Sequence, residues 1–131
     1  QITNLTSDGV VITKENLDEI PHEMGHYFGL LDTFEGSGTE LVNGSNCETE
    51  GDLVCDTPAD PYVPGQPIEN YVNVDLGCRF INPQTDANGD PYAPLVGNTM
   101  SDYPNECDCG FTNGQYLRMA NTYLNGPTRM W

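Results

Sequence analysis

Four residues between positions 22 and 32 have the types and spacing of a zinc site. The segment reads HEMGHYFGLLD, with His22 and His26 four residues apart and Asp32 six residues further on. Positions i and i+4 of a helix lie on the same face, so both imidazoles can bind one ion. Zn²⁺ prefers a tetrahedral shell, with nitrogen ligands at about 2.0–2.1 Å and carboxylate oxygens at about 2.0–2.2 Å. The pattern therefore predicts that His22, His26 and Asp32 bind Zn²⁺.

Glu23 follows the first histidine and has a different predicted role. It is positioned to take a proton from a water molecule whose pKa the metal lowers to about 7, and to pass that proton to a leaving amine. This chemistry hydrolyses peptide bonds. The alternative is a chance arrangement of two surface histidines on an acidic helix. Gly29 and Asp32, at three-residue intervals after His26, weigh against chance, and the chain has only two histidines.

The elements that must position these residues are short. Residues 9–13 (GVVIT) predict a strand. A helix is expected over residues 18–29, with Asp18 as its N-cap and Pro21 in the first turn, where the missing backbone N–H costs little. Gly29 can take the left-handed conformation that ends a helix, so the chain is expected to reverse there and return towards the ion.

Beyond this helix the pattern is irregular for a long stretch. Residues 32–98 are rich in Gly, Pro, Asn and Asp, and a loop region of this length is unusual in a compact domain unless disulfides, ions or function fix it. Helical spacing returns after Thr112 and Gln115, which form a capping-box pair, and the breaker NGP at 125–127 ends it. We expect a packing helix here, without a chemical role.

The overall charge limits the partners of the chain. Its 131 residues suffice for one domain, and twenty acidic against four basic residues give a formal net charge of −16. Such a chain is not expected to bind nucleic acid or anionic membrane surfaces, whereas cationic peptide segments and Ca²⁺ suit it. No apolar run approaches the length of a membrane span. The sequence opens at Gln1 in mid-pattern, so we expect a processed product or a piece of a larger parent protein.

Five cysteines lie in loop-like sequence away from the histidines, without a regular C-x-x-C zinc pattern. Their number and context predict a secreted protein in an oxidising, extracellular setting, with two disulfides and one remaining thiol. The preferred pairing joins Cys47 to Cys78 and Cys55 to Cys107 or Cys109, with other connectivities open.

Several stretches resemble one protein family. The spacing H-E-x-x-H-x-x-G-x-x-[H/D] resembles the metzincin signature, and further segments are similar to the pappalysin-type (cytophagalysin-like) zinc metalloproteases, especially their secreted bacterial members. In chain order these segments are SDGVVI, DTF, ELVNGSNC, GDLVCDTPADP, NTMSDYPNEC and FTNGQYLRM.

The resemblance implies an α+β, metzincin-like fold of which this chain is the C-terminal part. Such a part contains an active-site helix, a long irregular loop region stabilised by disulfides and ions, a methionine turn and a C-terminal helix. The whole chain is then one partial catalytic domain, in which residues 1–17 end the N-terminal subdomain, residues 18–29 form the zinc helix and residues 30–131 form the C-terminal subdomain. Most of the N-terminal sheet is expected to be absent.

The resemblance also assigns roles to single residues. Met100 is expected in a tight turn beneath the zinc, as a hydrophobic floor. The family has a histidine as third ligand, where this chain has Asp32, and usually a tyrosine two residues after the methionine, where this chain has Asp102 followed by Tyr103. Asp32 is a competent ligand that cancels more of the ion's charge, whereas a carboxylate at Asp102 would not stabilise a developing oxyanion.

Two further sites follow from the resemblance. A structural Ca²⁺ is expected in the loop after the zinc motif, with Asp52, Asp56 and Thr57 as candidate ligands and backbone carbonyls completing the shell. Glu106 lies in the segment that should line the pocket for the residue after the scissile bond, where it would favour Arg or Lys. The alternative for Glu106 is a solvated loop carboxylate.

These features predict a secreted zinc-dependent endopeptidase that acts on protein or peptide substrates and carries Zn²⁺ and Ca²⁺. The alternative is a catalytically impaired, metzincin-like pseudoprotease that serves as a metal-binding, structural or interaction module. Asp32 and Asp102 favour this alternative as departures from the family. The absent sheet does so too, because substrate usually docks along the edge strand of that sheet.

Overall fold

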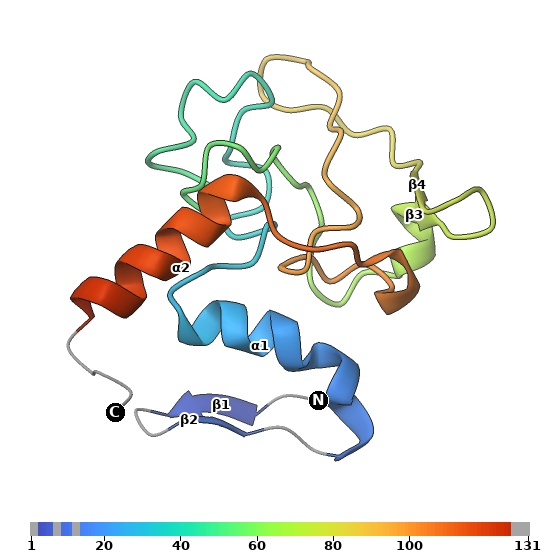
Figure 1. The fold of residues 1–131 in the computed structure, drawn as a ribbon. Coiled ribbons are helices and arrows are strands. Elements are labelled where there is room, and N and C mark those ends of the chain that lie inside the picture. The colour runs from blue at the N-terminus through green and yellow to red at the C-terminus, as the bar shows by residue number, and fades with distance from the viewer. Residues whose placement is uncertain (1–2, 7–8, 12–13, 127–131) are drawn as a thin grey trace.

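The computed structural model describes residues 3–6, 9–11 and 14–126, with side chains from Leu17 onward. Figure 1 shows α1 lying between a two-stranded hairpin and a large loop region. The elements in chain order are β1 (Thr3–Thr6), β2 (Gly9–Val11), a 3₁₀ turn (Lys14–Glu19), α1 (Ile20–Tyr27), a second 3₁₀ turn (Ile68–Asn70), β3 (Val72–Asn73), β4 (Arg79–Phe80), a third 3₁₀ turn (Asn105–Cys107) and α2 (Asn113–Asn125). This content is compatible with part of an α+β domain.

The first hairpin lies against α1. β1 and β2 pair antiparallel, with Leu5 opposite Val10 and an irregularity between Thr3 and Leu5. The sequence predicts the second strand but not the first, whose four residues TNLT carry little apolar alternation. Residues 12–13, the predicted end of that strand, lie outside the described residues.

The ends of α1 differ in how well the sequence predicts them. The predicted N-cap at Asp18 is wrong, because the α-helix begins at Ile20 and its N-cap, Glu19, makes no side-chain capping bond. A 3₁₀ turn leads directly into the helix instead, as is frequent at helix N-termini. The C-terminal end agrees with the prediction: Gly29 has a φ of +88°. Its N–H bonds to the carbonyl of His26, and the N–H of Leu30 bonds to that of Gly25, which together form a Schellman motif.

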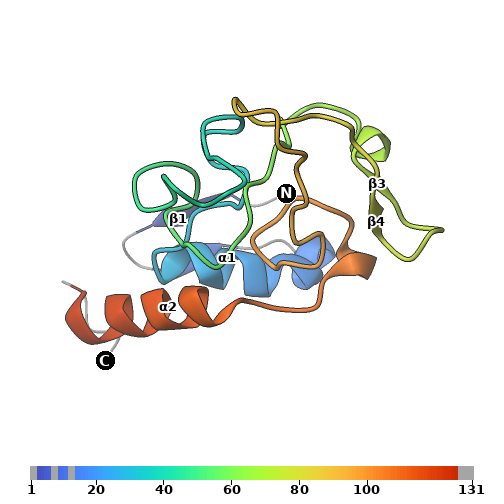
Figure 2. The same cartoon turned by 90° about the horizontal axis from the view of Figure 1, so that it is seen from above.

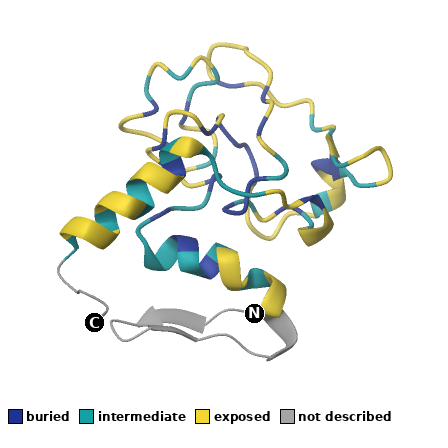
Figure 3. Cartoon of the chain, in the orientation of Figure 1, coloured by how far each residue is buried: buried dark blue, intermediate teal, exposed yellow. Residues whose placement is uncertain are grey.

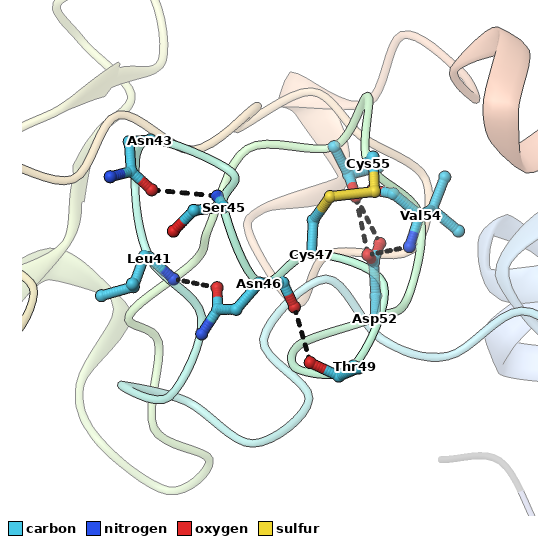
Figure 4. Close-up of a disulfide and its surroundings, with 10 residues drawn as sticks. Leu41, Asn43, Ser45, Asn46, Cys47, Thr49, Asp52, Val54 and Cys55 are labelled. Carbon is cyan, nitrogen blue, oxygen red and sulfur yellow. Dashed lines mark hydrogen bonds between the residues drawn. A yellow bond between two sulfur atoms is a disulfide. The ribbon is translucent and has the colours of Figure 1, made fainter.

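Two disulfides fix the long loop region (residues 32–98), but not with the predicted partners. Cys47 bonds to Cys55 and Cys78 to Cys107, while Cys109 is a free, exposed thiol. The predicted long-range pair of Cys47 with Cys78 is wrong because the chain turns sharply between the first two cysteines. Positive φ angles of 69° at Gly51 and 62° at Leu53 accompany this turn. The Cα atoms of Cys47 and Cys55 lie 5.1 Å apart as a result. Figure 4 shows this disulfide with the hydrogen bonds of its loop.

An aromatic core takes the place of a sheet in holding the loops together. The rings of Tyr62 and Phe34 lie 5.1 Å apart and those of Tyr62 and Tyr71 lie 5.2 Å apart, both edge to face. Figure 3 shows buried segments threaded through the loop region. The buried members of this core are Phe34, Tyr62, Tyr71, Val72, Tyr103 and Cys107.

α2 agrees with the prediction at its start and only partly along its length. Thr112 and Gln115 form the predicted capping box. Figure 2 shows α2 running beside α1. Arg118 Nε donates to the carbonyl of Gly29, just after α1, at 2.8 Å. The sequence places Tyr116, Met119, Ala120 and Tyr123 at helical spacing, with Leu117 and Leu124 beside them. Within the described residues, however, Tyr116 and Tyr123 are 54% and 39% exposed and the two leucines are 72% and 69% exposed, so much of this apolar surface is not covered. Neither helix in the described part of the chain is long and apolar enough to span a membrane.

Candidate metal centre

Three potential ligand atoms converge beside α1 (Ile20–Tyr27). The Nε2 atoms of His22 and His26 lie 3.1 Å apart. Asp32 Oδ1 lies 3.2 Å from each of them. The two histidines are one helical turn apart on α1, and the chain reversal at Gly29 brings the carboxylate back. The structure thus brings together the three residues that the sequence predicts as ligands.

Hydrogen bonds to backbone carbonyls orient both imidazoles. His22 Nδ1 donates to the carbonyl of Thr99 at 2.8 Å, and His26 Nδ1 donates to that of Leu30 at 2.9 Å. A carbonyl can only accept, so each Nδ1 carries a proton and a neutral ring presents its Nε2 lone pair. This is the arrangement by which a protein fixes the ligating nitrogen of a histidine.

The spacing of these atoms fits a tetrahedral zinc ion. Ligand atoms about 2.05 Å from such an ion are separated by about 3.3 Å, close to the observed distances. Two lone pairs and a carboxylate at this spacing repel one another unless they share a cation. The hydrogen bond with Asp32 raises the pKa of His26 to about 9, so a positive charge is favoured among these groups. Burial alone would raise the pKa of Asp32, but hydrogen bonds from the two imidazoles hold it at about 2.

Glu23 lies next to the converging atoms, and its carboxylate and the imidazole nitrogens of His22 and His26 all lie within 4.8 Å of one another. Its Oε1 is 3.8 Å from His22 Nε2, and the residue is 5% exposed. Burial raises the pKa of Glu23 above its usual value of 4.5. A carboxylate with a raised pKa near a reacting water is a suitable general base, because proton transfer works best when the pKa lies closer to the working pH.

Met100 lies directly under α1 and is fully buried. A Cβ atom at Gly25 would collide with Met100 Sδ and lie 3.3 Å from the ring of Phe111. Gly25, the helix residue before His26, therefore allows the methionine to approach the helix. The carbonyl of Met100 accepts the N–H of Thr33 at 3.0 Å, which ties this turn to the residue after Asp32.

A pocket of about 410 Å³ opens beside His22, Glu23 and Asp32. Glu106, the residue that the sequence predicts for this pocket, is not part of its wall. It lies exposed on the 3₁₀ turn Asn105–Cys107 and lines an adjoining hollow instead. We call His22, Glu23, His26 and Asp32 the metal-site group. The other acidic residues that line the pocket are Asp18, Glu19, Asp102 and Asp108.

Asp102, which stands where the family usually has a tyrosine, and the following Tyr103 point in different directions. Asp102 is exposed and contributes to the pocket wall. Tyr103 is 5% exposed, and its hydroxyl donates to Asp60 Oδ1 at 2.7 Å. The Tyr103 hydroxyl is therefore engaged inside the core and does not face the pocket through this bond.

Two of the three predicted calcium ligands lie together. Asp52 is 1% exposed, and Thr57 Oγ1 lies 2.7 Å from both of its carboxylate oxygens and 2.5 Å from the carbonyl of Val54. A hydroxyl has one proton, so acceptor oxygens outnumber donors here. Burial raises the pKa of Asp52 to about 6. This is an oxygen-rich environment of the kind that Ca²⁺ favours.

Glu40 is a member of this cluster that sequence reasoning missed. It is 6% exposed, and a Cβ atom at Gly51 would collide with its carboxylate. Burial and the charge of Asp52 raise the pKa of Glu40 to about 7. No local spacing connects residue 40 to residue 52, so only the resemblance of the ELVNGSNC segment could have indicated it.

Asp56, the third predicted calcium ligand, has a different role. Its Oδ1 accepts the hydroxyl of Thr112 at 2.7 Å and its Oδ2 accepts the N–H of Gly114 at 2.8 Å. The side chain thus caps the N-terminus of α2, where unpaired N–H groups and the helix dipole favour an anion. The turn between Asp52 and Asp56 directs the two carboxylates to different partners.

Known proteins resemble this chain over most of its length. The family model for M43 peptidases, described as pregnancy-associated plasma protein-A, matches residues 5–124. An extracellular metalloprotease of Pyricularia oryzae is 30% identical over 123 residues, which is 93% of this chain and 36% of the relative. Extracellular metalloproteases of Colletotrichum graminicola and Aspergillus oryzae are 33% and 30% identical over 60% and 79% of this chain, and 31% and 26% of their own lengths.

The chain therefore spans about a third of the length of these curated relatives. No solved structure matches it significantly. Because the family match covers nearly the whole chain, and the residues of the metal-site group lie within it, the chain belongs to the M43 peptidases, the pappalysin family of metalloproteases.

Proposed function

We propose that this chain carries the zinc site of a secreted metalloendopeptidase, in which His22, His26 and Asp32 hold Zn²⁺. The main support is that His22 Nε2, His26 Nε2 and Asp32 Oδ1 lie 3.1–3.2 Å from one another. The Nδ1 atoms of both histidines donate to backbone carbonyls, which leaves each Nε2 free to bind a metal. Two disulfides and the extracellular relatives support secretion.

When bound, zinc supplies a Lewis acid that activates water and polarises the scissile carbonyl. Glu23 acts as the general base: it takes the proton from the attacking water and passes it to the leaving amine. Its raised pKa helps the carboxyl group to hold the proton between these two transfers. Met100 packs against α1 at Gly25 and so helps to fix the position of the helix that carries the two histidines.

The substrate is a protein or peptide, and a basic residue after the scissile bond suits the pocket. Asp18, Glu19, Asp102 and Asp108 line the wall beside His22, and the net charge of −16 attracts cationic segments over a longer range. We attribute the preference for a basic substrate residue to these four carboxylates rather than to Glu106. Glu40, Asp52 and Thr57 are proposed to hold a structural Ca²⁺, which would compensate two buried carboxylates.

A non-catalytic metal-binding module is the second candidate. The exposed carboxylate of Asp102 faces the pocket, and the hydroxyl of Tyr103 is bound to Asp60, so the usual hydroxyl for an oxyanion is not available on this wall. A carboxylate beside a developing negative charge opposes the reaction.

A combined metal and cleavage assay separates the two candidates. We expect one Zn²⁺ per chain by metal analysis, and cleavage of a quenched peptide library that stops with a chelator. Glu23→Gln should keep the zinc and lose cleavage by at least 100-fold, as expected for the loss of a general base. Asp32→Ala should lose the zinc itself. Stoichiometric zinc without any cleavage would favour the module, and a chain without zinc would overturn both candidates.

A further inference from the structure

A buried pair of side-chain amides joins α2 to the turn under the metal-site group. Gln115 is fully buried and Asn98 is 4% exposed. Asn98 Nδ2 donates to Gln115 Oε1 at 2.8 Å, and Gln115 Nε2 donates to Asn98 Oδ1 at 3.0 Å. The same Gln115 Oε1 accepts the N–H of Thr112 at 2.9 Å. Both amides are therefore held by reciprocal bonds in a place without solvent.

Asn98 in turn fixes the backbone that follows it. Its Oδ1 also accepts the N–H of Met100 at 2.9 Å, and its carbonyl accepts the N–H of Ser101 at 3.0 Å. Between these residues lies Thr99, whose carbonyl accepts His22 Nδ1 at 2.8 Å. The path from Gln115 to the ring of His22 thus passes through Asn98 and one short turn.

We propose that Gln115 is a positioning residue of the metal site, which acts through Asn98 on the carbonyl that orients His22. This inference rests on the proposed zinc function. Only an amide of this length supplies both an acceptor for Asn98 Nδ2 and a donor for Asn98 Oδ1. Without it Asn98 loses two of its bonds, and the turn that carries the Thr99 carbonyl and Met100 loses its anchor on α2.

The test uses Co²⁺ in place of zinc, because its visible absorption reports ligand geometry. Gln115→Met keeps the length and helix preference of the side chain but removes the amide. We expect a shift in the Co²⁺ bands and a loss of Zn²⁺ affinity of about 10-fold, the lower end for residues that support a ligand. Asn98→Ser is the second variant, because serine can still accept the N–H of Met100 while it loses the bonds to Gln115. It should give the same spectral shift.

Two controls separate positioning from stability. Thr112→Val removes the capping hydroxyl of α2 but keeps the amide pair, so it should lower the unfolding temperature without a change in the Co²⁺ bands. Asn125→Ala breaks an amide pair with Asn121 at the far end of α2 and should change neither. Folded Gln115→Met or Asn98→Ser with wild-type bands and affinity would overturn the positioning role. A wild-type chain that binds neither metal would instead refute the proposed function.

Discussion

Asp60 illustrates how the partners of one side chain set its effect on stability. It is 3% exposed. Its Oδ1 accepts from the Tyr103 hydroxyl and its Oδ2 from the Thr33 hydroxyl at 2.8 Å. Burial raises the pKa of Asp60 above its ordinary value of 3.8, even though these bonds oppose the shift, and the charge of Asp102 adds to the rise. The folded chain therefore holds a proton on this group more tightly than the unfolded chain.

The consequence is a stability that falls as the pH rises. Below about pH 4 the group is protonated in both states and contributes nothing; above that, the unfolded chain loses its proton first. Asp60→Asn removes this titration while its amide can still bond to both hydroxyls. We expect the variant to gain free energy of unfolding relative to wild type between pH 4 and pH 7.5, measured by urea denaturation. Asp75→Asn, at an exposed position, corrects for net charge, and a difference that does not change with pH would contradict the assignment.

In the described part of the chain, α1 and α2 begin in different ways, and the residues that satisfy the first N–H groups differ between them. α1 continues from a 3₁₀ turn and uses no side-chain cap. α2 uses two capping groups, the capping box of Thr112 with Gln115 and the carboxylate of Asp56, which comes from the distant loop region. The second group ties that loop to the helix that carries Gln115.

Asp56→Ala should therefore destabilise α2. The loss of the bonds to Thr112 and Gly114 is expected to cost about 1 kcal/mol of unfolding free energy, within the usual range for a lost cap. Glu48→Ala, an exposed acid in the same loop region, is the matched control. Calcium affinity should not change in Asp56→Ala, because the cluster of Glu40, Asp52 and Thr57 remains. A strong loss of Ca²⁺ binding would restore the predicted ligand role of Asp56.

The described loop region is held by two disulfides and an aromatic core, since its strands β3 and β4 together contain four residues. The two bonds close loops of different size: Cys47 and Cys55 are 8 residues apart, and Cys78 and Cys107 are 29 apart. The second bond also lies in the aromatic core and holds the turn Asn105–Cys107 at the edge of the pocket.

Removal of the longer bond should cost more. In the chain-entropy description the difference in loop size alone favours the Cys78–Cys107 bond by about 1 kcal/mol. We expect the Cys78→Ala/Cys107→Ala variant to unfold at lower urea than Cys47→Ala/Cys55→Ala. Cys109→Ser, at the exposed thiol, should resemble wild type. If both double variants lost the same free energy of unfolding, the loop-size argument would be wrong, and other interactions in the 47–55 loop would have to depend on its disulfide.

Local features of this chain could be predicted from the sequence because each depends on a few neighbouring residues. The i, i+4 spacing of His22 and His26, the reversal at Gly29 and the capping box of Thr112 with Gln115 are of this kind. The third candidate ligand, Asp32, follows the reversal by three residues, so its approach to the imidazoles could also be expected.

The remaining features were decided by the path of the long loop region. Four features do not follow from the spacing of residues in the sequence. They are the Cys47–Cys55 bond, the cap that Asp56 provides, the burial of Glu40 and the exposed position of Glu106. The Cys47–Cys55 bond depends on the sharp turn between the two cysteines, and the other features depend on which distant segments meet. A loop without periodic structure leaves these choices to turns, disulfides and packing. The sequence by itself thus predicted His22, His26 and Asp32 as zinc ligands, because their spacing is local. Only the tertiary structure decided what surrounds them: the carbonyl of Thr99 that accepts from His22 and, behind it, the paired amides of Asn98 and Gln115.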